Sequence, residues 1–283
     1  MDWVLPLRSD WATPIAKTFS ILGYSPFFLV FLPLAYWLWD RERSTRLVVL
    51  ICLTGLLNAW LKDFWQDPRP GPEYALDPEV GTSFGRPSGH AQVSAVMWLW
   101  LAHELKRPWA WAAAIFIIAG VSFSRLYLGV HDLDDVAAGL ALGVATFGVV
   151  AWATGPSIDL GRRLPPIARL AVVAALVPIA SWTWPMERGP GRATPILFLL
   201  FGWLVGRAFD QRLAPERPVA WWKGSVVAIV GIAAIFTLRA GFVAIGAGLG
   251  LSESATGDAA TLAIGLFTTW LAPLAFRALG LLG

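Results

Sequence analysis

Long apolar stretches constrain this sequence more than any other feature. A helix that crosses a bilayer needs about 20 mostly apolar residues, and it must be helical to satisfy its own backbone groups away from water. Stretches of this kind lie at residues 18–39, 45–61, 89–104, 108–126, 134–153, 166–184, 194–209, 222–246 and 260–280. They predict an all-α fold, a polytopic transmembrane helical bundle of about nine spans.

The composition excludes several classes of protein. Hydrophobic residues make up 57% of the chain and charged residues only 14%, whereas a soluble domain carries roughly 25% charged residues. The 17 Trp and 16 Phe residues suit a membrane interface, where aromatic rings collect. A single cysteine, Cys52, allows no intrachain disulfide. A soluble enzyme, a disordered tail and a disulfide-rich secreted protein are therefore excluded, and an integral membrane protein is expected.

The charge distribution predicts an orientation in the membrane. If the N-terminus lies outside, the segments that face inward hold most of the 22 Lys and Arg residues, as the positive-inside rule requires. Nine spans then place the C-terminus inside. The net charge is only +3 with no clustered basic face, so no nucleic-acid partner is expected. Residues 1–17 mix apolar side chains with charges and prolines, which predicts an interfacial segment without a cleavable signal peptide.

Two polar loops, residues 62–89 and 125–134, face the same, outer side in this topology. Their prolines and glycines predict structured loops, and loops on a rigid scaffold often carry chemistry. The candidate site residues are Lys62, Arg69, Ser88, Gly89, His90, Arg125, His131 and Asp135.

Three cations on one face indicate an anion site. The planar guanidinium groups of Arg69 and Arg125 suit phosphate oxygens, and Lys62 adds a point charge. Ser88 and Gly89 lie where a helix is expected to begin, so their N–H groups should point at the same anion.

Two imidazoles could supply a nucleophile and an acid without a metal. Asp135 lies four residues after His131, so the two share a helical face if a span begins there. Such a carboxylate holds Nδ1–H and leaves Nε2 free to attack phosphorus. The neighbouring acidic residues suggest a metal site, but the three cations would repel a divalent ion.

Each residue also has an ordinary structural explanation. A single histidine at a span end is more often an interfacial residue than a nucleophile. Lys62 and Arg69 could extend to the interface from apolar stems, and the acids after His131 could be a solvated helix start. These explanations do not account for all the groups falling on one face.

The three motifs K-x6-RP, PSGH and SR-x5-H-x3-D are present in order. They resemble the signature of the type-2 phosphatidic acid phosphatase superfamily, which includes vanadium haloperoxidases, bacterial acid phosphatases and glucose-6-phosphatase. The resemblance covers about residues 18–185 and implies a six-span core. It implies that His131 forms a phosphohistidine, that Asp135 orients it and that His90 protonates the leaving oxygen. Equatorial phosphoryl oxygens would be held by Lys62, Arg69, Ser88, Gly89 and Arg125. No metal or other cofactor is implied.

Residues 186–283 form a three-span extension beyond that core. Nine spans in total give a layout similar to the glucose-6-phosphatase branch, by topology alone. Arg239 lies inside a predicted span, where an ionisable residue is a functional candidate. It could serve as an accessory site residue, pair with Glu253 or Asp258, or extend to the outer interface.

The expected function is hydrolysis of a lipid phosphomonoester or diphosphate, such as undecaprenyl diphosphate, phosphatidic acid or phosphatidylglycerol phosphate. The expected place is a bacterial-type inner membrane, with the site on its outer face and the lipid bilayer and substrate as partners. Three alternatives stay open: a sugar-phosphate phosphatase, a lipid phosphoryl or headgroup transferase, and an inert transporter. The sequence leaves the headgroup and the oligomeric state open.

Overall fold

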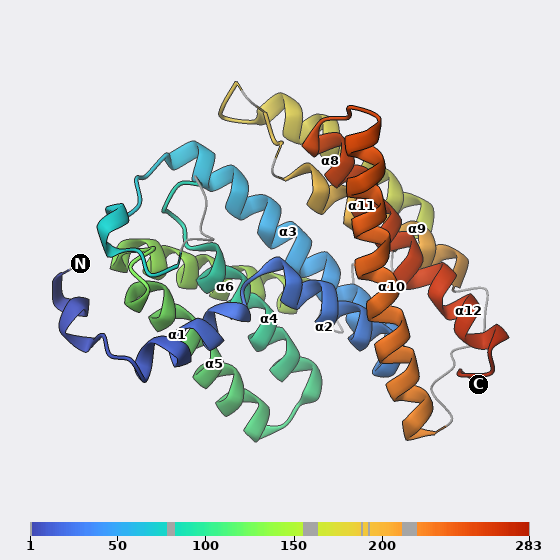
Figure 1. Cartoon of the computed structure of the whole chain (residues 1–283), viewed down its shortest axis with the longest axis horizontal. Helices are drawn as coiled ribbons and strands as arrows, with labels where there is room; N and C mark the ends of the chain where they lie inside the picture. Colours follow the sequence, from blue (N-terminus) through green and yellow to red (C-terminus); the bar gives the residue numbers. More distant parts are fainter. Residues whose placement is uncertain are drawn as a thin grey trace. The chain divides into compact units, whose positions relative to one another are not determined.

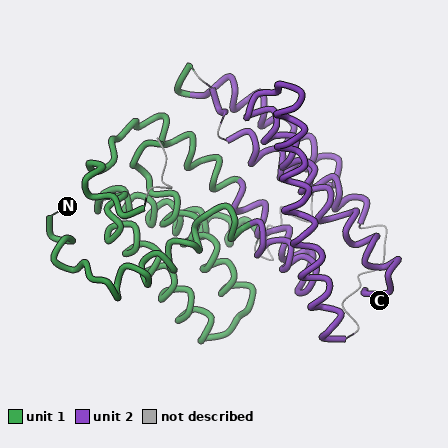
Figure 2. Tube along the Cα trace, in the orientation of Figure 1, with its two compact units in different colours: residues 1–28, 53–161, 185–187 green, residues 29–52, 162–184, 188–283 purple. Residues whose placement is uncertain are grey.

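The computed structural model describes residues 2–77, 83–154, 164–187, 189–191, 193–210 and 220–282. Helices dominate these residues, and none of them forms a β-strand. The chain divides into two compact units (Figure 2). Unit 1 comprises residues 1–28, 53–161 and 185–187, and unit 2 comprises residues 29–52, 162–184 and 188–283. Unit 2 thus includes two segments that the sequence analysis assigned to the six-span core.

The helices follow the apolar stretches closely (Figure 1). In chain order they are η1 (Asp2–Leu7), α1 (Ala12–Ile21), α2 (Ser25–Leu38), α3 (Arg41–Trp65), η2 (Pro72–Tyr74), α4 (Gly89–Leu105), α5 (Pro108–Tyr127), α6 (Leu133–Ala153), α8 (Pro166–Thr183), α9 (Thr194–Asp210), α10 (Trp221–Gly248), α11 (Glu253–Leu266), the π-helical turn η4 (Phe267–Leu271) and α12 (Ala272–Ala278). Every predicted stretch after the first coincides with one helix, or with the continuous run α11–η4–α12. The all-α prediction is confirmed for the described residues.

Six described helices are long and apolar enough to cross a membrane, and the bent pair α1–α2 makes a possible seventh span. The two remaining predicted spans correspond to α4 and α9, which have only 17 residues each. The predicted first span, 18–39, is wrong as a single helix, because α1 and α2 meet at an angle of 53°. Pro26 explains the break, since its ring would clash with the carbonyl of Leu22 in a continuous helix.

Close contact between α4 and α6 shapes unit 1, and it depends on two glycines. A Cβ added to Gly139 would lie 2.6 Å from the carbonyl oxygen of Ser88, and one added to Gly143 would lie 2.7 Å from that of Gln92. Small residues four apart let helix backbones approach in this way. The contact brings the N-terminal ends of α4 and α6 together, which places their first turns side by side.

We expect Gly143→Ala to destabilise the protein, because the new methyl group meets the backbone of α4. Overpacking of this kind costs about 1–3 kcal/mol. Gly148 lies on the same helix with no atom within 4 Å of an added Cβ. There the same substitution should be neutral or stabilising, because alanine favours helices over glycine. Thermal unfolding in detergent measures both, and equal melting temperatures would contradict the packing argument.

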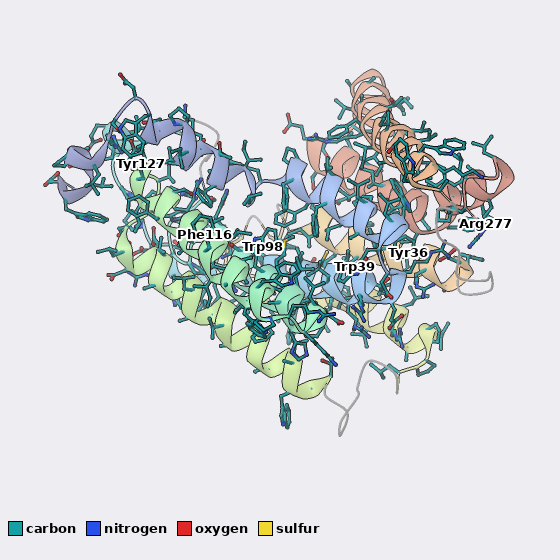
Figure 3. All side chains as sticks on the ribbon, turned by 90° about the horizontal axis from the view of Figure 1, so that it is seen from below. Tyr36, Trp39, Trp98, Phe116, Tyr127 and Arg277 are labelled. Carbon is teal, nitrogen blue, oxygen red and sulfur yellow. The ribbon has the colours of Figure 1, made fainter. Side chains whose placement is uncertain are left out.

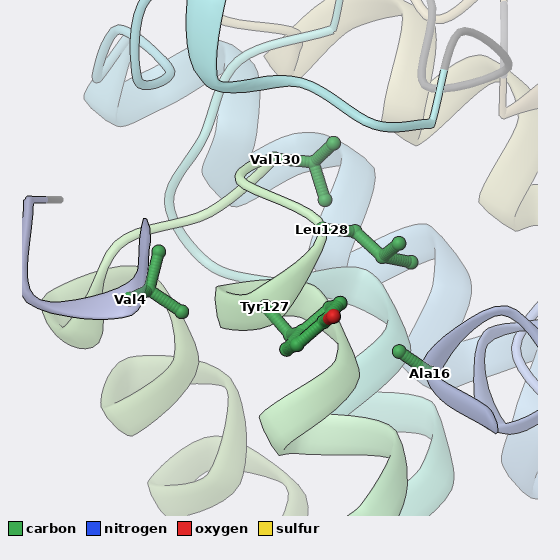
Figure 4. Packing of buried hydrophobic residues seen from close by; sticks show 5 residues of the cluster. All are labelled: Val4, Ala16, Tyr127, Leu128 and Val130. Carbon is green, nitrogen blue, oxygen red and sulfur yellow. The ribbon is translucent and has the colours of Figure 1, made fainter. Parts of the chain in front are cut away.

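A buried apolar cluster joins the N-terminal segment to the end of α5. It consists of Val4, Ala16, Tyr127, Leu128 and Val130 (Figure 4). The guanidinium of Arg8 donates to the backbone carbonyls of Tyr127 and Tyr74 beside it. The N-terminal segment therefore fixes the turn that follows α5.

Unit 2 contains a buried charged cluster of its own. The carboxylate of Asp210 accepts hydrogen bonds from Arg41 at 3.1 Å, from Arg207 at 3.3 Å and from Arg277 at 3.4 Å. Tyr36 also donates to it, at 2.6 Å; Tyr36 and Arg277 are labelled in Figure 3. A carboxylate shared in this way ties α2, α3, α9 and α12 together.

Candidate active site

All eight candidate residues of the three motifs belong to unit 1. Lys62 is in the last turn of α3, Arg125 in the last turn of α5, and Asp135 in the first turn of α6. Buried among them are Lys62, Ser88, Arg125, His131 and Asp135, whereas Arg69, Gly89 and His90 are half-buried. The arrangement places charged groups at helix ends, where loops can complete the site.

His131 and Asp135 form the central pair of the site. Nδ1 of the imidazole lies 2.8 Å from Oδ2 of Asp135. Helix α6 begins at Leu133 and is capped by Asp132, whose side chain accepts from the backbone N–H of Asp135 at 2.9 Å. His131 therefore precedes the helix instead of lying on it, so the condition for a shared helical face is not met, although the contact itself forms. The cap fixes the backbone of Asp135 in a position from which its carboxylate contacts the imidazole of His131.

The pair leaves Nε2 of His131 as the candidate nucleophilic atom. A carboxylate at Nδ1 favours the tautomer that carries its proton there, with a lone pair on Nε2. Arg69 Nη1 lies 3.1 Å from Nε2. Burial, followed by the charges of Arg69, Lys62 and Arg125, lowers the pKa of His131 well below its usual value. The imidazole is therefore neutral at neutral pH.

This electrostatic coupling predicts a change in pH dependence. Arg69→Gln removes a positive charge beside Nε2, so the pKa of His131 should rise toward its ordinary value of about 6.5. Because activity needs the neutral imidazole, the acidic limb of kcat/KM should move to higher pH. The control Arg86→Gln removes a charge that is not a cause of the His131 shift and should leave the limb in place. An unmoved limb in Arg69→Gln would contradict the coupling.

Lys62 and Arg69 bind the same short loop. Nζ of Lys62 donates to the carbonyl oxygens of Phe84 and Gly85, the latter at 2.7 Å. Nε of Arg69 donates to the carbonyl oxygen of Ser83 at 2.7 Å. Gly85 is needed there because a Cβ would lie 2.8 Å from Oδ2 of Asp135. Both cations are thus fixed around the His131–Asp135 pair.

The start of α4 corrects one expectation from sequence. Ser88 is the N-cap residue, as expected, but its N–H donates to the carbonyl oxygen of Asp135 at 2.9 Å. That N–H cannot also bind an anion. Instead the buried Oγ of Ser88 has no hydrogen-bond partner within the described part of the chain. Ser88 therefore offers its hydroxyl group, and Gly89 and His90 offer N–H groups of the first helical turn, which lack intrahelical acceptors.

His90 packs against the break between α1 and α2. Its ring stands edge-on to Tyr24, with centroids 4.7 Å apart. A Cβ on Gly23 would collide with the imidazole, so only glycine permits this approach. Nε2 of His90 is buried and has no partner among the residues that the structure describes, which leaves it available to a substrate oxygen.

Sequence reasoning missed five residues that hold the site. Asn58 donates to the carbonyl of Pro87 at 3.1 Å and to Oε1 of Gln92 at 2.8 Å. Both amides are buried in apolar stretches, and that was a usable signal, because polar residues inside spans are costly. Ser20, Tyr24 and Asp77, which meet Arg125, had no such signal.

Three carboxylates near the site lie close enough to hold a cation. Ligand atoms of Asp67, Asp132 and Asp135 are all within 4.8 Å of one another. Asp135 is already engaged with His131, and Arg86 Nε lies 3.7 Å from Asp67. A guanidinium group thus already offsets part of this negative charge. Chemistry without a metal stays a prediction.

Arg239 lies within α10, in unit 2, and its side chain is exposed. Over the described ranges it forms no ion pair or hydrogen bond with Glu253 or Asp258. Its predicted accessory role stays a prediction.

Several known proteins are similar to part of this chain. A model of the PAP2 superfamily matches residues 43–158. Phosphatidylglycerophosphatase B of Bacillus subtilis is 31% identical over 51% of this chain and 76% of its own length. An undecaprenyl-diphosphatase of Sulfolobus acidocaldarius is 39% identical over 44% of this chain and 62% of its own length.

A third relative is dihydrosphingosine 1-phosphate phosphatase YSR3 of Saccharomyces cerevisiae, 26% identical over 53% of this chain and 42% of its own length. The chain thus spans less than half of several relatives that it matches. Its apolar helices and these relatives make it a membrane protein. The matched family model, the share of phosphatidylglycerophosphatase B that is covered and the three assembled motifs lead to one conclusion: the chain belongs to the PAP2 superfamily.

Proposed function

We propose that this protein is a membrane phosphatase that hydrolyses a phosphomonoester or diphosphate on a lipid through a phosphohistidine intermediate. The observation that carries the proposal is the His131–Asp135 pair at 2.8 Å, with Nε2 next to the guanidinium of Arg69. A neutral, oriented imidazole beside fixed cations suits attack on a phosphoryl group. Relatives named as lipid phosphatases support the same substrate class.

The reaction would proceed in two steps. Nε2 of His131 bonds to phosphorus while the bond to the leaving oxygen breaks. His90, which takes up a proton when the anionic substrate offsets the charges of the surrounding cations, gives that oxygen its proton. A water molecule then attacks the phosphohistidine as His90 takes its proton, and His131 departs from inorganic phosphate. Developing charge on the equatorial oxygens would be stabilised by the cations, the Ser88 hydroxyl and the first N–H groups of α4.

We also propose the finer topology. Nine spans would cross the membrane, with the N-terminus outside, the C-terminus inside and the site at the outer face of a bacterial-type inner membrane. Helix α3 supports this topology, because Arg41 is its first residue and Lys62 lies in its last turn. If α3 crosses the membrane with Arg41 at the inner face, Lys62 and the site lie at the outer face. A site at the bilayer boundary would let the acyl or isoprenyl chain stay in lipid while the phosphate reaches the cations.

Phosphate release from a substrate panel tests the function. Detergent-solubilised protein would be assayed in EDTA with phosphatidic acid, an isoprenyl diphosphate, a sphingoid-base 1-phosphate and glucose 6-phosphate. We expect hydrolysis of at least one lipid, unaffected by EDTA and inhibited by vanadate, which mimics the five-coordinate phosphoryl group. Hydrolysis of the sugar phosphate alone would overturn the lipid assignment. Phosphoryl transfer to an added lipid alcohol, without phosphate release, would indicate a transferase.

A separate prediction concerns Arg239. If it contacts the substrate headgroup, Arg239→Leu should raise KM and leave the melting temperature unchanged. The motivation is the cost of placing a guanidinium inside a span, about 2.5–3.5 kcal/mol at the bilayer centre. Lys223→Leu, at the start of the same helix, is the control for loss of a positive charge. If kinetics and stability both stay unchanged, Arg239 only extends to the interface and has no accessory role.

A further inference from the structure

Asp77 lies outside the three motifs yet contacts a residue of one of them. It follows η2 in the loop between α3 and α4 and is almost completely buried. Oδ2 of Asp77 is 3.2 Å from Nη1 of Arg125. The same oxygen accepts a hydrogen bond from the hydroxyl of Tyr24. Nη1 of Arg125 also donates a hydrogen bond to Oγ of Ser20. One end of the guanidinium is therefore held by acceptors of the protein itself.

We propose that Asp77 is a positioning residue that holds the Arg125 guanidinium by Nη1, so that its Nε edge is presented to the phosphoryl group of the substrate. This inference rests on the proposed phosphatase function, and it adds a residue that the motifs do not include. Asp77 would act through Arg125 and would not touch the substrate.

Asp77 and the substrate do not compete for the same donors of Arg125, because they would bind different ends of its guanidinium group. A guanidinium offers several N–H donors in a rigid plane, so an acceptor at one end leaves the other end usable. Asp77 and Ser20 accept hydrogen bonds from Nη1. Nε of Arg125 is buried and has no acceptor among the described residues. A buried donor without a partner is costly, and a phosphoryl oxygen would satisfy it.

The orientation of Arg125 is further restricted by its surroundings. Its guanidinium carbon lies 5.7 Å from the centroid of the Tyr24 ring, and its side chain is only 1% exposed. Asp77 is anchored to the same end of α5, because the N–H of Leu76 donates to the carbonyl of Leu128 at 2.8 Å. Carboxylate and guanidinium are thus fixed relative to one another before substrate binds.

The test combines substitutions of both partners. Asp77→Asn keeps the shape but weakens the contact, and loss of a charge-assisted hydrogen bond corresponds to about a 10- to 100-fold fall in kcat/KM. The vanadate dissociation constant should rise by a similar factor. Because Asp77 acts through Arg125, adding Asp77→Asn to Arg125→Gln should change kcat/KM little further. Tyr24→Phe, which keeps the ring, should give a smaller loss in the same direction.

Glu73→Gln is the matched control, since this exposed acid lies in the same loop and its change removes the same charge. It should leave both measurements unchanged. Multiplicative losses in the double variant, unchanged kinetics in Asp77→Asn, or tighter vanadate binding in Asp77→Asn would each overturn the positioning role. Vanadate affinity is measured by calorimetry and needs no turnover. A wild type that releases no phosphate would therefore refute the proposed function, while the role of Asp77 is still decided by binding.

Discussion

Replacing the proposed nucleophile should nearly abolish activity: in His131→Ala, phosphate release from the preferred lipid falls by at least about a thousandfold. The covalent step needs an atom with a lone pair at the position of Nε2. His90 cannot supply it, because its ring is packed against Tyr24. Cations and helix N–H groups would still bind inorganic phosphate, whereas vanadate should bind more weakly because it loses Nε2 as its fifth ligand. Loss of kcat with retained phosphate affinity and an unchanged melting temperature would separate lost chemistry from lost folding.

Labelling tests the covalent step directly. Wild-type protein mixed with a ³²P-labelled lipid phosphate and quenched in base should retain label as phosphohistidine, and His131→Ala should retain none. His103→Ala is the matched control, because it lies at the exposed, opposite end of α4 from His90. Label and turnover should stay at wild-type levels there. Label that persists in His131→Ala would identify a different nucleophile.

The helices could be predicted from sequence because each apolar stretch must satisfy its backbone in lipid, a local requirement. The break between α1 and α2 could not be recognised in the same way. Apolar residues continue on both sides of it, so hydropathy alone does not mark the new start near Gly23 and Pro26. The distribution of residues between the two units depends on which helices pack together, and Gly143 shows why. Its role depends on the carbonyl of Gln92, which lies more than 50 residues earlier in the chain.

The candidate site residues could be proposed from sequence because they stand at fixed spacing within three short motifs, but the contacts that support them could not. Asp77, Ser20 and Tyr24 come from segments that meet Arg125 only after folding. The N–H of Ser88 shows a related limit. Sequence placed it correctly at the start of α4, yet the carbonyl of Asp135 occupies it. Hydrogen bonds between distant segments decide which donors stay free, and spacing alone does not encode them.

Asp135→Asn should lower kcat by about 100- to 10,000-fold, comparable to the loss when an amide replaces the carboxylate that orients a catalytic histidine. The carboxylate has two roles that the amide cannot perform together. It accepts the Nδ1 proton at 2.8 Å, and its charge stabilises the cationic imidazole that forms when Nε2 bonds to phosphorus. An amide that turns its NH₂ group toward Nδ1 would favour the wrong tautomer, with the proton on Nε2.

The neighbouring Asp134 supplies a matched control for this change. It lies in the same turn of α6, but its side chain is 80% exposed and its contact with Arg86 is 3.4 Å long. Asp134→Asn should therefore change kcat less than twofold, because exposed ion pairs contribute little. The backbone N–H of Asp135 still caps against Asp132 in Asp135→Asn, so the melting temperature should change far less than kcat. If Asp135→Asn keeps kcat within a few-fold of wild type, another group must set the tautomer of His131, and the pair loses its central place in the mechanism.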